Sequence, residues 1–130
     1  MKSIEEIAHI HHVDLHLNVS GETNSGYCSR ANSTCNAEIY ITKCDSTEIQ
    51  HAIFFHELGH ILQKLSNYDF PHQFHYELDA WMEGFKIGYT YGYFIDPKTF
   101  FEITTKCLLN YSETGINYRL DGGTVDAKVW

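Results

Sequence analysis

The stretch that decides the fold is residues 54–62, which read Phe54-Phe55-His56-Glu57-Leu58-Gly59-His60-Ile61-Leu62. Residues four apart on a helix lie one above the other on one face, so a helix here places His56 and His60 side by side. Two neutral imidazoles at this spacing can bind one metal ion, and a catalytic zinc ion usually takes three protein ligands. Glu57 adjoins the pair and is spaced to act as general base toward a water molecule on the metal.

The residues around this motif are apolar on nearly every side, a pattern that predicts a buried helix. Buried imidazoles and carboxylates need polar partners, because leaving them unpaired costs several kcal/mol. A metal ion would supply such a partner. The alternative is an ordinary core helix whose histidines bond to backbone groups or carboxylates, and the motif favours the metal.

Local signals set the bounds that we expect for this helix. Asp45 is followed three residues later by Glu48, which is the pattern of a reciprocal capping box. We therefore expect the helix to run from about Ser46 to about Leu65. Alternating apolar residues over 37–44 predict a strand directly before it. If that strand lies at a sheet edge beside the metal, its free backbone groups could pair with an extended peptide.

The N-terminal third predicts a helix, a strand and a long loop. Residues 3–11 form the expected helix, with Ser3 as its cap in a second capping box. Strict alternation over 13–19 predicts a half-buried strand. Residues 20–36 are rich in Ser, Gly, Asn and Thr, which predicts a loop that borders the cleft and can hold a short strand near 27–30.

A second helix is expected from about His72 to about Tyr93, and it should carry a third metal ligand. The candidates are His72, His75, Glu77, Asp79 and Glu83. We favour Glu77, because it shares a helical face with a ladder of small residues at Ala80, Gly84, Gly88 and Gly92. Such a ladder lets two helices approach closely, which a carboxylate needs in order to reach a metal held on its neighbour. Asp79 is rotated away from this face and ranks second.

The remaining chain predicts one more helix and a polar tail. Asp96 followed by Pro97 is a helix start, and that helix should continue to about Asn110. Residues 111–130 are polar and glycine-rich, so we expect them to be extended or loosely packed. The 130 residues are long enough for one core, and we treat 1–130 as a single domain. The expected fold class is α+β, with a small β-sheet packed against the motif helix and the second helix carrying the third ligand.

Composition excludes several classes of function. A net charge of −8 argues against a nucleic-acid partner, which would require a basic patch. No apolar run is long enough to span a membrane. The N-terminus lacks the apolar segment of a signal peptide, so we expect a cytoplasmic protein.

The cysteines and the N-terminal histidines are expected to stay outside metal chemistry. The cysteines are Cys28, Cys35, Cys44 and Cys107, and in a reducing compartment all four should be free thiols. In an oxidising compartment Cys28 and Cys35 could instead form a disulfide. A Cys-rich second zinc site of Cys28, Cys35, Cys44 and a histidine is less favoured, because the paired short spacing of such sites is missing. The histidines at positions 9, 11, 12 and 16 fit surface residues better than ligands.

The text HELGHILQ at residues 56–63, followed by YELDAW at 76–81, resembles the gluzincins, and among them the small ImmA/IrrE-type metallopeptidases and related phage-encoded proteins. The resemblance covers about residues 37–90. It implies a minimal zincin-like domain in which His56, His60 and Glu77 bind Zn²⁺ and Glu57 is the base. It also implies a specific intracellular protein as substrate. Thermolysin-like enzymes carry an Asp four residues after the third ligand, where this chain has Trp81, so the group that orients the histidines is left unassigned.

These observations predict a zinc metallopeptidase acting on a protein or peptide. The alternative is a catalytically silent zincin-like module that binds a protein partner and uses zinc structurally, and the intact Glu57 favours the enzyme. A peptidase also needs a donor for the developing oxyanion. The candidates are Tyr68, His72, His75, Tyr76 and Tyr89. The same ligand set also accepts Mn, Co or Ni.

Overall fold

The computed structural model describes residues 1–108 and has α+β architecture, as expected. Its mixed sheet has the strand order β1-β3-β2. Strand β1 (Val13–Val19) runs parallel to β3 (Ala37–Thr42), whereas β2 (Gly26–Ser29) is antiparallel to β3. The helices within the described residues are α1 (Ile4–Ile10), α2 (Thr47–Leu62), α3 (Gln73–Thr90) and a helix over 97–108, with a 3₁₀ turn η1 (Asn67–Asp69) between α2 and α3. None of them is both long and apolar enough to cross a membrane.

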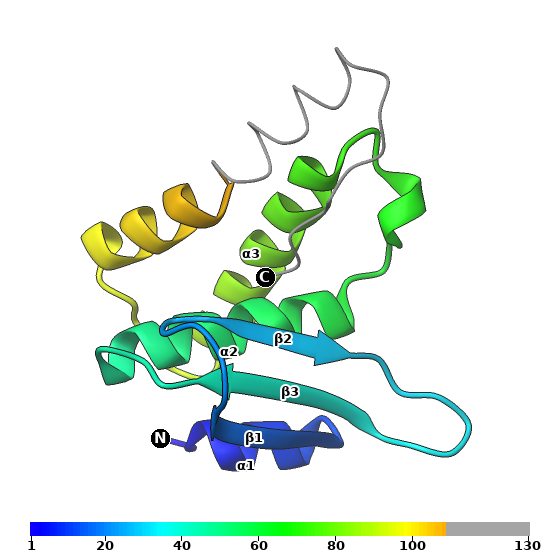
Figure 1. Cartoon of the computed structure of the whole chain (residues 1–130), viewed down its shortest axis with the longest axis horizontal. Coiled ribbons are helices and arrows are strands. Elements are labelled where there is room, and N and C mark those ends of the chain that lie inside the picture. The colour runs from blue at the N-terminus through cyan, green and yellow to red at the C-terminus, as the bar shows by residue number, and fades with distance from the viewer. Residues whose placement is uncertain (109–130) are drawn as a thin grey trace.

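Helix α1 begins at the predicted cap. The Ser3 hydroxyl accepts a hydrogen bond from the Glu6 amide at 3.1 Å, and the Glu6 carboxylate accepts one from the Ser3 amide at 3.2 Å. The chain then turns into β1, and α1 lies beside that strand (Figure 1).

The cap predicted for the motif helix was wrong. Ser46, rather than Asp45, caps α2, because its hydroxyl accepts from the Ile49 amide at 3.1 Å. Asp45 instead exchanges two hydrogen bonds of 2.8 Å with Asn24, one through its carboxylate and one through its amide. These bonds fasten the loop before β2 to the start of α2. The helix also ends at Leu62, earlier than predicted.

Helix α2 is enclosed by the rest of the fold. Every residue from Ala52 to His60 is buried. On one side α2 packs against the sheet and α1 in the main core. On the other side it contacts α3 (Figure 1). A smaller cluster that includes Trp81, Ile103 and Cys107 packs there against Ala52 of α2. The prediction of a buried motif helix is therefore confirmed.

Small residues set the distance between α2 and α3. A Cβ atom built at Gly84 would overlap the carbonyl oxygen of Phe55, and one at Gly59 would overlap that of Ala80. Gly88 faces the Phe55 ring. The predicted ladder on α3 is confirmed at these positions, and it has a glycine partner on α2.

The prediction that Gly92 is the fourth member of that ladder was wrong. Gly92 lies beyond the helix with a φ of 85°, a left-handed conformation that favours glycine. It ends α3 before the predicted bound at Tyr93. Asp96 caps the next helix as predicted, since its carboxylate accepts from the Thr99 amide at 3.1 Å. The expected end of that helix near residue 110 and the tail over 111–130 lie outside the described residues.

The edge strand beside the motif is β2 rather than the strand that precedes α2. Strand β3 is central in the sheet, so the condition under which it would offer a free edge is not met. The short strand predicted near residues 27–30 exists as β2, and it packs closely on α2. A Cβ at Gly26 would collide with the Ile53 side chain, so glycine permits this approach. The approach brings Cys28 beside Glu57.

Candidate metal centre

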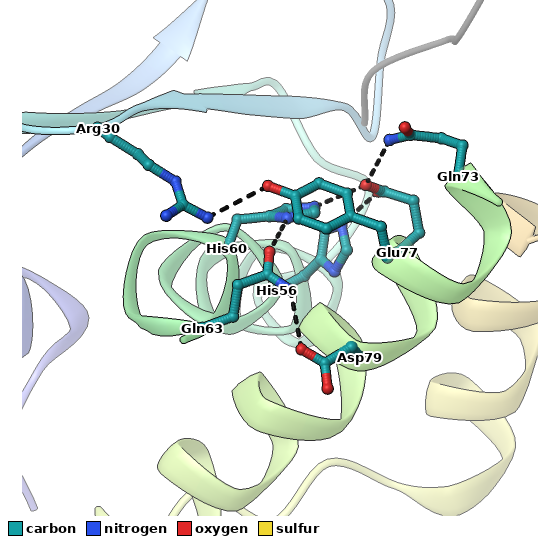
Figure 2. Close-up of polar contacts among 8 residues, drawn as sticks. Arg30, His56, His60, Gln63, Gln73, Glu77 and Asp79 are labelled. Atoms are coloured by element: carbon teal, nitrogen blue, oxygen red, sulfur yellow. Dashed lines mark hydrogen bonds and ion pairs between the residues drawn. The ribbon is translucent and has the colours of Figure 1, made fainter. Parts of the chain in front are cut away.

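The three predicted ligands converge between α2 and α3. The Nε2 atom of His56 lies 3.2 Å from Oε1 of Glu77, and the Nε2 atom of His60 lies 2.9 Å from Oε2. The two imidazole rings are 4.6 Å apart between centroids. All three residues are buried. Figure 2 shows the Glu77 carboxylate directed at the two rings.

A chain of hydrogen bonds fixes the orientation of His60. The Gln63 amide nitrogen donates to the Asp79 carboxylate at 2.9 Å, which turns the Gln63 oxygen toward Nδ1 of His60 at 2.8 Å (Figure 2). An amide oxygen can only accept, so Nδ1 of His60 carries a proton. When the ring is neutral, its Nε2 atom therefore presents a lone pair to the centre, as metal-binding histidines require.

The proton on Nδ1 of His60 bears on whether a cation fits the centre. If His60 is neutral, its Nε2 lone pair faces a carboxylate oxygen at 2.9 Å, and two acceptors at that distance repel each other. Either a second proton on His60 or a metal ion must lie between them. His56 differs, because a neutral ring can donate from Nε2 to the other oxygen of Glu77 at 3.2 Å. A divalent cation can satisfy all three side chains at once, so the donor set fits a metal.

Charge and burial act in opposite directions on the pKa values of the cluster. Burial lowers the pKa of His60, but the hydrogen bond and charge of Glu77 outweigh it and raise that pKa above the usual value. Burial raises the pKa of Glu77, but the two imidazoles lower it overall. Without a metal, Glu77 therefore favours the protonated form of His60, and the two imidazoles favour the carboxylate form of Glu77.

Trp81 takes the place that an orienting carboxylate has in thermolysin-like enzymes. Its ring stacks on His56 with centroids 4.1 Å apart and planes 22° apart. Trp81 stands one helical turn after Glu77, so α3 contacts His56 through both residues. The indole fixes the plane of this imidazole by packing, whereas Gln63 fixes that of His60 by a hydrogen bond.

The remaining candidates for the third ligand lie elsewhere. Asp79, ranked second, bonds to Gln63 rather than to a histidine ring. His72 caps α3 by accepting from the Phe74 amide, and His75 is exposed. Glu83 lies 3.5 Å from Lys86. Gln63 was missed, since its only signal was a position three residues after His60.

A cavity of about 290 Å³ opens onto the centre. Glu57, His60 and Glu77 line its inner side. Cys28, Arg30, Asn67, Gln73 and Tyr76 line the remainder, so the predicted loop does border the cleft. Both oxygens of Glu57 are buried, and the Cys28 thiol is the side chain that lies against this carboxylate. Burial raises the pKa of Glu57, although the charges of His56 and His60 lower it in part.

Among the oxyanion candidates, Tyr76 is the residue that lines this cavity. Its ring lies against His60 with centroids 4.8 Å apart. Burial raises the pKa of Tyr76 although Arg30 lowers it in part, so the phenol keeps its proton at neutral pH. Arg30 donates to the Tyr76 oxygen at 3.3 Å, which leaves the phenol hydrogen free to donate in turn. Tyr68 and Tyr89 are strongly exposed.

Cys107 is a further donor near the centre that the sequence analysis did not single out. Its sulfur, one His56 nitrogen and one Glu77 oxygen lie within 4.8 Å of one another, as do donor atoms of His56, Glu57 and His60. Cys107 comes from the helix over 97–108, and no spacing rule connects it to the motif. Burial raises the pKa of its thiol to about 12, so the thiol is protonated without a metal.

The other cysteines and the N-terminal histidines lie apart from the centre within residues 1–108. All four cysteines are free, so the predicted thiols are confirmed and Cys28 is not joined to Cys35. No Cys-rich group with metal-binding spacing exists in that part of the chain. The N-terminal histidines form no such group there either: His11 lies 2.8 Å from the Tyr91 hydroxyl, and His16 lies 3.3 Å from Glu38.

Comparison with known proteins adds no relative. No family profile matches the chain, no curated protein matches its sequence, and no solved structure matches its fold. The assignment of function therefore rests on the geometry of the centre.

Proposed function

We propose that the protein is a zinc-dependent peptidase of minimal zincin-like type. The observation that carries the proposal is the convergence of His56, His60 and Glu77 beside a cavity that also contains Glu57. Two imidazoles and a carboxylate are a ligand set of catalytic zinc, which keeps one coordination position open. When bound, zinc supplies Lewis acidity that polarises a carbonyl group and lowers the pKa of water.

Glu57 is the proposed general base. Its carboxylate accepts a proton from a water molecule in the cavity as the water oxygen attacks the peptide carbonyl carbon. The C–N bond then breaks, and Glu57 returns the proton to the amine, so one water yields a carboxylic acid and an amine. The Tyr76 hydroxyl is the proposed donor to the carbonyl oxygen as negative charge develops there. Within residues 1–108 the outer edge of β2 is unpaired, and it can pair with an extended peptide beside the cavity.

Metal content and turnover of matched variants test this function. The purified protein should hold one zinc ion per chain and cut peptides. Glu77→Gln should lose zinc, while Glu83→Gln, a carboxylate change on the same helix, should keep it. Glu57→Gln should keep zinc and fold but lose at least about 10²-fold in kcat, the usual contribution of a general base. A protein that binds no zinc when zinc is supplied contradicts the proposal.

One observation favours the second candidate, a binding module with structural zinc. A Cys107 thiolate would add a fourth protein ligand, and structural zinc sites are closed by four. Cobalt replacing zinc reports this directly, because a thiolate ligand adds an intense near-ultraviolet absorption. If that band is present and disappears in Cys107→Ser, the result supports a structural zinc site with four protein ligands. If the band is absent, one coordination position of the metal remains open. For either function we propose a cytoplasmic setting, since free thiols are typical of reducing compartments.

A further inference from the structure

Arg30 stands out among the residues of the cavity by its charge. It directly follows β2, and its guanidinium reaches toward the centre (Figure 2). No other Arg or Lys of the described residues lines this cavity. Within residues 1–108 no carboxylate lies within ion-pair distance of Arg30. Its hydrogen bond to the neutral Tyr76 hydroxyl holds it at the cavity without neutralising it.

The unused capacity of Arg30 suits a carboxylate. A guanidinium has five N–H donors in a planar fork, and one donor is occupied by Tyr76. The free donors match the two oxygens of a carboxylate, a geometry that lysine lacks. A peptide lying along the free edge of β2 would pass this group, because Arg30 continues that strand.

The negative net charge of the protein does not prevent Arg30 from binding a carboxylate. The chain carries a net charge of −8, which repels an acidic peptide at long range. At physiological ionic strength, however, charges separated by more than about 8 Å are largely screened. A direct contact with Arg30 is much shorter than that, so the local cation decides. The carboxylates of Glu57 and Glu77 would be offset by the two positive charges of a bound zinc ion.

We propose that Arg30 determines specificity by binding a carboxylate of the substrate close to the bond that is cut. The proposal rests on the peptidase function proposed above. The carboxylate is either an Asp or Glu side chain or the free C-terminus of the peptide. Both carry the same chemistry, and the experiment separates them.

The experiment uses the zinc-loaded full chain and a random synthetic peptide library with free and amidated C-termini. Mass spectrometry locates the bonds that are cut. We expect Asp or Glu to be enriched at one position beside the cleaved bond if a side chain is bound. If a chain end is bound, we expect cleavage only near free C-termini.

A pair of peptides then isolates Arg30. The two peptides differ only in carrying a carboxylate or an amine at the selected position. The native protein should prefer the acidic peptide by about fivefold or more in kcat/KM, the upper range for an exposed ion pair. Arg30→Glu should reverse the preference, mostly through KM. Lys43→Glu makes the same charge change at the opposite end of the sheet and should leave the preference intact.

The possible results separate the specificity role of Arg30 from the peptidase function itself. Loss of activity toward both peptides in Arg30→Glu, without a gain for the basic one, would mean that Arg30 only supports Tyr76. Cleavage with no acidic or C-terminal preference would overturn the role of Arg30 and leave the peptidase intact. A zinc-loaded protein that cuts no member of the library would overturn the peptidase function, and the specificity role would fall with it.

Discussion

At the scale of single residues, Gln63 shows how one side chain can set the chemistry of another. It links His60 to Asp79 through two hydrogen bonds and so determines which ring nitrogen carries the proton. Gln63 and the His60 ring are both buried, where a wrong tautomer would direct an N–H toward the proposed metal. Orienting residues of this kind are therefore expected to matter almost as much as the ligands.

Replacing Gln63 tests this role. Gln63→Ala should weaken zinc affinity by about 10- to 100-fold, the usual effect of losing a partner that orients a ligand. Competition with a coloured chelator measures the dissociation constant. Gln50→Ala, a matched change in the first turn of α2, should leave the affinity unchanged. Equal zinc affinity in all three proteins would show that His60 is oriented by packing alone.

At the scale of elements, the centre depends on how closely α3 approaches α2. Glu77 reaches both histidines only because Gly84 and Gly59 let the two backbones touch. The same approach places Trp81 on His56. The small residues therefore position Glu77, the proposed third ligand, without contacting it.

A methyl group at Gly84 should separate the helices. Gly84→Ala would press a Cβ against the Phe55 carbonyl, and we expect it to destabilise the fold by about 3 kcal/mol, the upper range for overpacking. Gly88→Ala is the control, because its Cβ would lie 3.2 Å from a Phe55 ring atom. That cost is smaller and is offset by a gain in helix propensity of about 1 kcal/mol. Urea unfolding measures both, and equal stability of the two variants would contradict a tight crossing at Gly84.

At the scale of the whole molecule, the buried charges link stability to pH. In the metal-free protein, the raised pKa of His60 gives stability that is complete below its usual value of 6.5 and is lost as pH rises through the raised value. The lowered pKa of Glu77 gives stability that is complete above 4.5 and is lost as pH falls through the lowered value. Burial raises the pKa of Glu57, so its ionisation destabilises the folded state as pH rises above 4.5.

These signs predict opposite pH trends with and without zinc. When a chelator keeps the protein free of metal, its melting temperature should be highest between about pH 4.5 and 6.5 and should fall as pH rises further. With zinc the fall should reverse, because zinc binds the deprotonated ligands and its stabilisation grows with pH. At 100 times its dissociation constant, zinc should add about 2.7 kcal/mol. Thermal melts across pH in both conditions measure this, and parallel curves would mean that zinc does not bind this cluster.

Local signals in the sequence predicted the helices and strands, with errors at some of their ends, and predicted which residues converge between α2 and α3. The spacing of His56 and His60 follows from the period of a helix, and the small residues beside Glu77 indicated a close helix crossing. Capping at Asp45 was misjudged because several polar side chains competed for one helix start, and the choice of Ser46 depends on Asp45 bonding to Asn24, which is distant in sequence.

Only the tertiary structure decided which distant residues complete the site. Cys28 and Arg30 reach the cavity because β2 joins the far edge of the sheet, and Cys107 arrives on a separate helix. The choice of Tyr76 among five candidates was likewise a matter of which side chain faces the cavity. Helix periodicity links residues within a few positions of one another. Contacts between distant segments depend on how whole elements pack, so the sequence by itself determined the motif and the tertiary structure determined its surroundings.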